Sequence, residues 1–138
     1  MKRFLIISAI AIIVVISGQA QSYQKTDLGV KAKINSTKVE IQFYGPSTVR
    51  VLKSPEGKTF TKESLSVVKK AQATKLAINQ QGDVILLKSD KLKVNVNVRS
   101  GKISYSTLAG EQLLSEKESG ATFIDFDDAG SKSKSGIA

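Results

Sequence analysis

The sequence contains no cysteine, no histidine and no tryptophan, and these absences exclude several kinds of chemistry. Without histidine or cysteine, Ser-His-Asp and Cys-His catalytic arrangements are impossible, and so are ordinary zinc sites. A sugar epimerase or mutarotase that depends on a His/Glu pair is excluded for the same reason. Without cysteine, an exported chain must be stabilised by its hydrophobic core and not by disulfides.

Twelve acidic residues remain, and a pair of carboxylates could serve a glycosidase as acid and nucleophile. The sequence gives no reason to select any two of them, because most lie at polar strand positions or in turns. The run Asp125-Phe126-Asp127-Asp128 is only faintly similar to a calcium loop, and an ordinary turn after a strand is favoured. We therefore expect no catalytic residue, no metal site and no cofactor in this chain.

Basic residues are in excess, with 21 Lys and Arg against 12 Asp and Glu and a formal net charge of +9. Such an excess can indicate nucleic-acid binding. Here the lysines are spread along the chain, often on the polar faces of expected strands, where they oppose edge-to-edge pairing. We interpret them as a solvated surface and expect no nucleic-acid partner.

Residues 1–20 have the features of a secretory signal peptide. A basic start and an apolar stretch at residues 4–16 are followed by Gly18-Gln19-Ala20, which is suited to cleavage before Gln21. The apolar stretch is shorter than the roughly 20 residues of a membrane-spanning helix, which disfavours the alternative of a retained anchor. We expect an exported protein, periplasmic or secreted, with no stable membrane span after cleavage.

The strongest pattern in the chain lies at residues 91–99, where every second residue is apolar. These apolar residues are Leu92, Val94, Val96 and Val98. A period of two predicts a strand with one face on a core and the other in water. The Ser100-Gly101 pair that follows predicts a hairpin turn in which Gly101 adopts a positive φ.

Similar alternating runs recur at a spacing of roughly eight to twelve residues, separated by short turns, and this spacing predicts an all-β fold, an antiparallel β-sandwich. We place one domain at residues 21–128, after the signal peptide, and expect an irregular polar lead-in at residues 21–27. Residues 129–138 are low in complexity, which predicts a disordered tail or a truncated linker.

Tyr44 and Tyr105 are the candidate binding residues, because the alternation places both on the polar faces of their strands. An exposed tyrosine can stack on a sugar ring, although a single exposed aromatic residue needs no functional explanation. The sequence leaves open whether the two tyrosines share a face. They are named here as speculative carbohydrate-binding residues.

Several stretches of the chain together are similar to a known protein family. They are residues 38–51, which include Val49-Arg50-Val51, then Ser54-Pro55-Glu56-Gly57, residues 62–68, residues 91–106 and residues 126–130. The chain resembles the N-terminal domain of glycoside hydrolase family 31, the α-glucosidases and α-xylosidases, as found in exported enzymes of Bacteroides-like bacteria. The resemblance extends over residues 23–130 and implies a β-sandwich of galactose-mutarotase-like type.

In that family this domain packs beside a (β/α)8 barrel with two catalytic aspartates, so the resemblance implies a fragment that lacks the catalytic barrel. The barrel of the parent enzyme would be the main partner, with carbohydrate as a second one. We expect a non-catalytic domain that shapes the barrel entrance in an enzyme that hydrolyses α-linked glucosides or xylosides.

The alternative is a free-standing exported β-sandwich that binds carbohydrate or a cell-surface partner. The surface of the domain separates the two hypotheses. A domain without its barrel should expose a contiguous apolar patch, whereas a free-standing binding module should have a polar surface with a groove or an aromatic platform.

Overall fold

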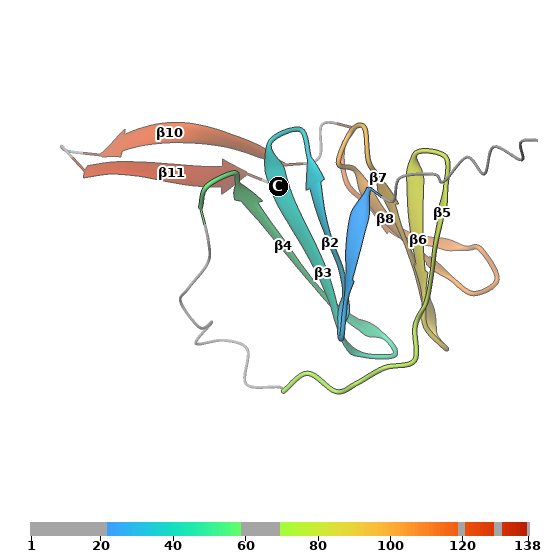
Figure 1. Cartoon of the computed structure of the whole chain (residues 1–138). Helices are drawn as coiled ribbons and strands as arrows, with labels where there is room; N and C mark the ends of the chain where they lie inside the picture. The colour runs from blue at the N-terminus through green and yellow to red at the C-terminus, as the bar shows by residue number, and fades with distance from the viewer. Residues whose placement is uncertain (1–21, 59–69, 119–120, 129–130, 138) are drawn as a thin grey trace, which may run out of the picture.

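The computed structural model describes residues 22–58, 70–118, 121–128 and 131–137, and regular structure in these ranges consists of β-strands (Figure 1). Residues 1–20, where the sequence predicts a signal peptide, lie outside the described residues. Within the described ranges, no helix has the length and apolarity needed to cross a membrane. The strands are β1 (Tyr23–Thr26), β2 (Gly29–Ile34), β3 (Thr37–Gly45), β4 (Thr48–Pro55), β5 (Ala77–Gln81), β6 (Val84–Lys88), β7 (Leu92–Asn97), β8 (Ile103–Thr107), β9 (Gln112–Ser115), β10 (Thr122–Asp128) and β11 (Ser131–Ile137).

The strands form two larger sheets and one separate hairpin. Strands β1 to β4 make a four-stranded sheet, β5 to β9 a five-stranded sheet, and β10 and β11 pair with each other. Within each sheet the strands follow chain order and all pairs are antiparallel, because short turns cannot join parallel strands. Figure 1 shows the two larger sheets facing each other, with the β10–β11 hairpin extending to one side. The predicted all-β antiparallel sandwich is confirmed.

The hydrophobic core lies between the two larger sheets and is built from every second residue of their strands. Its buried members are Tyr23, Val30, Ile34, Val39, Ile41, Phe43, Ile85, Leu87, Val94, Val96 and Ile103. Leaving water stabilises each large apolar side chain by roughly 1.5–3 kcal/mol. The pattern at residues 91–99 is confirmed, because β7 is the middle strand of its sheet and buries Val94 and Val96.

The turn after β7 also agrees with the sequence. Gly101 has a φ of 75°, in the left-handed region that favours glycine. The side-chain Oδ1 of Asn97 accepts hydrogen bonds from the backbone N–H groups of Arg99 and Ser100, both at 2.9 Å. The backbone N–H of Gly101 donates to the carbonyl of Asn97 at 2.9 Å, which closes the turn.

Two terminal segments differ from the sequence-based expectations. Residues 23–26 were expected to be irregular but form β1, because Tyr23 buries its ring in the core while the backbone pairs with β2. Residues 131–137, within the segment expected to be disordered or a linker, form β11, which pairs with β10 along its whole length. A ladder needs only backbone N–H and C=O groups, which even a low-complexity sequence supplies.

Candidate functional site

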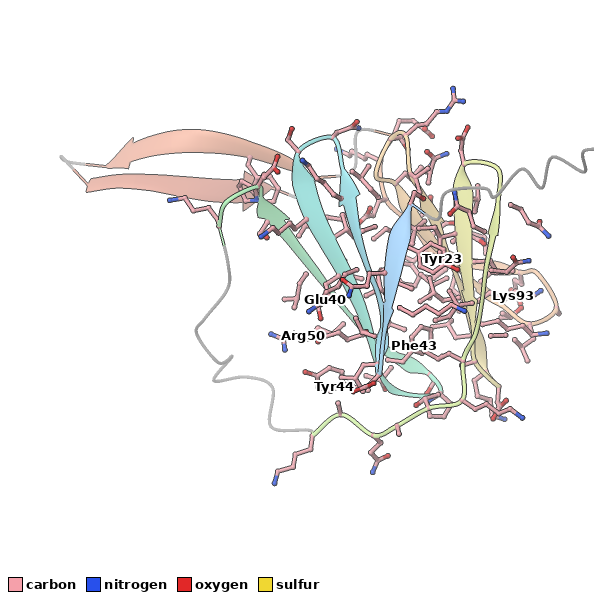
Figure 2. All side chains as sticks on the ribbon, in the orientation of Figure 1. Tyr23, Glu40, Phe43, Tyr44, Arg50 and Lys93 are labelled. Carbon is pink, nitrogen blue, oxygen red and sulfur yellow. The ribbon has the colours of Figure 1, made fainter. Side chains whose placement is uncertain are left out.

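Tyr44 lies on the outer face of β3, as the sequence predicts. Its neighbours Phe43 and Gly45 face inward and are buried, while Tyr44 is partly exposed. The guanidinium of Arg50, on β4, donates through Nη1 to the Tyr44 hydroxyl at 2.9 Å and lies 6.0 Å from the ring centroid (Figure 2). The phenol and the cation therefore form one polar unit on the outer surface of the sheet.

Further polar side chains extend this unit across the same face. Gln42 Nε2 donates to Glu40 Oε1 at 2.7 Å, and the Lys31 ammonium lies 3.5 Å from the same carboxylate oxygen. Glu40 and Gln42 alternate with Tyr44 along β3 and so share its face. The resulting surface offers hydrogen-bond donors, acceptors and one aromatic ring, which suits recognition of hydroxyl groups.

Tyr105 faces the core, and its predicted position on a polar face is wrong. It lies opposite Val94 in the β7–β8 register, and Ile103, two residues earlier on the same face, is fully buried. Burial, with a smaller effect of the nearby Glu116 carboxylate, raises the pKa of Tyr105 to about 12. Tyr44 and Tyr105 lie in different sheets and face in different directions, so they do not form a common platform.

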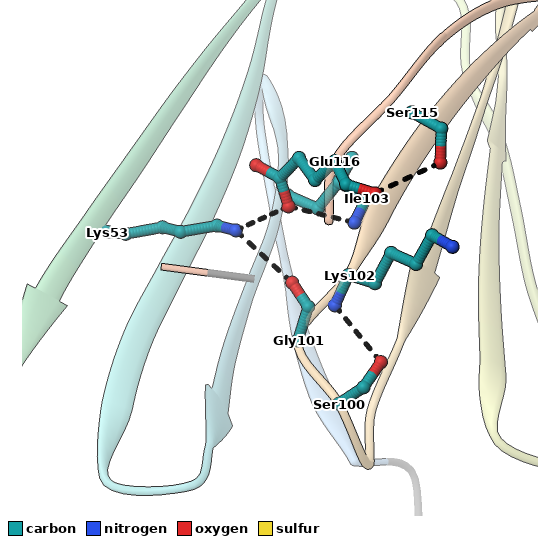
Figure 3. Close-up of polar contacts among 7 residues, drawn as sticks. All are labelled: Lys53, Ser100, Gly101, Lys102, Ile103, Ser115 and Glu116. Carbon is teal, nitrogen blue, oxygen red and sulfur yellow. Dashed lines mark hydrogen bonds and ion pairs between the residues drawn. The ribbon is translucent and has the colours of Figure 1, made fainter. Parts of the chain in front are cut away.

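A buried ion pair connects the two sheets, and the sequence analysis missed it. Lys53 lies opposite Val39 on the inner side of β4, and its side chain is only 9% exposed. Its ammonium donates to Glu116 Oε2 at 2.6 Å and to the Gly101 carbonyl at 3.2 Å, while the backbone N–H of Ile103 donates to Glu116 Oε2 at 2.9 Å (Figure 3). The alternation along β4 could have indicated it, because a lysine occupies a core position.

A small pocket lies beside this ion pair, at one end of the sandwich. Its volume is about 80 Å³, and the polar side chains that line it are Asn35, Thr37, Lys53 and Ser100. Sugar and drug-sized ligands need pockets of about 300–1,000 Å³. The pocket is therefore suited to ordered water and not to a sugar ring. In the described ranges, no group of three or more His, Cys, Asp or Glu side chains is placed to hold a metal ion.

The largest exposed apolar side chains of the described chain lie on the β8–β9 hairpin. Leu113 and Leu114 on β9 are 57% and 62% exposed, and Leu108 in the preceding turn is 39% exposed. β9 forms one edge of the five-stranded sheet. The exposed large apolar side chains of the described ranges therefore lie together on one hairpin at the edge of the sandwich.

Comparison with known proteins agrees with this architecture. The sequence model of the glycosyl hydrolase 31 N-terminal galactose mutarotase-like domain matches residues 38–136. The structure is similar to that of a GH31 alpha-xylosidase from Xanthomonas citri, with a TM-score of 0.72, 24% sequence identity and coverage of 82% of this chain. The chain spans 13% of the length of that enzyme. The match over residues 38–136 shows that the chain belongs to the family of glycosyl hydrolase 31 N-terminal galactose mutarotase-like domains.

Proposed function

We propose that this chain acts as the non-catalytic N-terminal β-sandwich of a family 31 α-glycosidase, where it packs on the catalytic barrel and shapes its entrance. The observation that carries the proposal is the family match over residues 38–136. The whole enzyme would hydrolyse α-linked glucosides or xylosides, and the similarity to an alpha-xylosidase supports this substrate class. The described part of this chain contributes a buried core and a polar outer face.

Reading the coding DNA beyond the Ala138 codon is the first test of this proposal. A continuing frame that encodes a barrel with paired catalytic aspartates is the expected result. The encoded polypeptide should hydrolyse p-nitrophenyl α-xyloside or α-glucoside, and the 138-residue chain alone should not. Hydrolysis by the chain alone, or a frame without barrel sequence, would contradict the proposal.

A second function, carbohydrate binding by the chain itself, is favoured by the polar array around Tyr44. The test is retention of the chain on immobilised α-glucans or xyloglucan, with Tyr44→Ala and the control Lys93→Ala on the outer face of the other sheet. Loss of one stacking residue is expected to weaken retention about two- to tenfold, on the scale of about 0.5–1.5 kcal/mol for an aromatic contact. Equal retention of both variants, or no retention of the parent chain, removes this function.

We also propose that the protein is exported to the periplasm or secreted, on the basis of the signal-like residues 1–20. N-terminal sequencing of the protein recovered from a fractionated native host tests this. A mature chain that begins at Gln21 outside the cytoplasm is expected, and a cytoplasmic chain that begins at Met1 would contradict export.

A further inference from the structure

β9 is an edge strand without the charged residues or proline that often protect sheet edges, although it is short and its register with β8 shifts at Tyr105 and Ser106. An exposed edge presents unpaired backbone N–H and C=O groups, and charged residues or proline normally discourage pairing there. Of the other edges of the two larger sheets, β1 carries the exposed Lys25, and β4 carries the inward-facing Lys53 and Pro55. The β5 edge, like β9, has neither a charge nor a proline, but it exposes the polar Asn79 and Gln81. β9 has the sequence Gln112-Leu113-Leu114-Ser115, with neither a charge nor a proline.

The apolar side chains of β9 are largely exposed. Leu113 and Leu114 are both more than half exposed, and Leu113 lies at the register shift between β8 and β9, where the regular alternation of faces is interrupted. The described part of the chain therefore leaves both leucines largely uncovered. Figure 1 draws the turn between β8 and β9 as a loop that projects from the five-stranded sheet. Such an element can insert into a partner, where both leucines leave water.

We propose that the β9 edge, defined as Leu108, Leu113, Leu114 and the free backbone side of β9, docks on the catalytic part of the same family 31 polypeptide. This inference rests on the proposed function and names the surface by which the domain would be held. The chain spans only 13% of the alpha-xylosidase it resembles, so most of such an enzyme lies outside this domain and must contact it somewhere. The exposed leucines of this edge are the described apolar side chains best placed for that contact.

A second copy of this chain is a poorer occupant of the β9 edge. Stable interfaces between separate proteins bury about 1,200–2,000 Å², more than a four-residue strand and three leucines can supply. Two linked domains need less, because the linkage gives an effective concentration of about millimolar. Antiparallel pairing of two β9 strands about their centre would also place Glu111 opposite Glu116 of the second copy, and like charges directly opposite are destabilising.

The experiment compares two double variants in two contexts. The variant L113S/L114S changes the β9 edge, and the control N79S/Q81S changes two exposed residues of β5, at the opposite edge of the same sheet. Both are made in the 138-residue chain and in the whole polypeptide encoded by the continuing reading frame. Thermal unfolding, trypsin digestion and light scattering are measured for each protein.

In the 138-residue chain, we expect a monomer and changes in Tm within about 2 °C for both variants, because all four positions are exposed. In the whole polypeptide, L113S/L114S should separate the unfolding of this domain from the rest and speed its digestion about tenfold, whereas the control should not.

Equal behaviour of both variants in the whole polypeptide would overturn the inference and leave the proposed function intact. A dimer of the chain that L113S/L114S dissociates would assign the edge to a second copy. A large fall in Tm in the chain alone would show that its own residues cover β9. A reading frame without a barrel would overturn both proposals.

Discussion

The ion pair between Lys53 and Glu116 should stabilise the contact between the two sheets, and Glu116→Ala tests this. The substitution leaves the Lys53 ammonium, whose side chain is 9% exposed, with the Gly101 carbonyl alone as acceptor, and it removes the acceptor of the Ile103 N–H. Breaking a buried ion pair by removing one partner costs about 3–5 kcal/mol. Because the Glu116 side chain is 23% exposed and water can reach the site, we expect a loss of about 2–3 kcal/mol.

The assay is urea unfolding followed by circular dichroism, with the free energy of unfolding obtained by linear extrapolation. The matched control is Glu56→Ala, which breaks the Lys33–Glu56 pair. That pair has the same N···O distance of 2.6 Å, but its side chains are 61% and 52% exposed. Exposed pairs contribute about 0–1 kcal/mol, so the control should change the free energy of unfolding little. The comparison therefore separates the effect of burial from that of distance.

Two results would refute this reasoning about the Lys53–Glu116 pair. A loss of less than about 1 kcal/mol for Glu116→Ala would place the pair among ordinary exposed pairs. The double variant Lys53→Met/Glu116→Leu, which replaces both charges by apolar groups, should recover at least about half of the loss, because it leaves no buried charge unpaired. A double variant less stable than Glu116→Ala would show that the charges themselves are not the cause.

Three further predictions concern the core and its surroundings. Gly29→Ala should destabilise the fold by about 2 kcal/mol or more, because a Cβ there would lie 2.1 Å from the carbonyl oxygen of Ile41. Urea unfolding measures the loss of stability, and an unchanged unfolding midpoint would contradict the prediction. Phe43→Ala should lower the free energy of unfolding by about 3–5 kcal/mol, since Phe43 is fully buried. Tyr44→Ala, on the outer face of β3, should lower it by about 1 kcal/mol or less. Similar falls in Tm for the two variants would contradict the inward position of Phe43 and the outward position of Tyr44. Burial raises the pKa of Tyr105 to about 12 in the folded chain, so the tyrosine of the unfolded chain ionises first as the pH rises. The stability that the neutral Tyr105 side chain contributes is therefore complete below pH 10 and is lost between about pH 10 and 12. Tyr105→Phe should remove this part of the pH dependence, measured by urea unfolding at pH 9 to 12, and an unaltered slope would refute it.

The sequence predicted the features that depend on neighbouring residues. Alternation at residues 91–99 identified β7 and its buried valines, and Ser100-Gly101 identified the turn with its positive φ. Short turns between successive strands indicated antiparallel pairing and hence the sandwich. The resemblance at residues 38–68 indicated the family, which the match over residues 38–136 confirmed. The strand and turn signals each lie within a few residues, and the resemblance is a property of the residue order itself, so no distant contact is needed to read them.

Other features were decided only when distant strands came together. The inward direction of Tyr105 depends on the β7–β8 register, because a shift of one residue would move its side chain to the outer face. Lys53 is 63 residues from Glu116, and no local pattern in the sequence connects them. β1 and β11 became strands through backbone pairing, which requires a neighbouring strand and little from the side chains. The sequence by itself thus determined the fold class and the family, through local periodicity. Tertiary structure alone decided the facing of Tyr105, the buried ion pair and the exposure of β9, because burial and charge pairing are properties of the packed sheets.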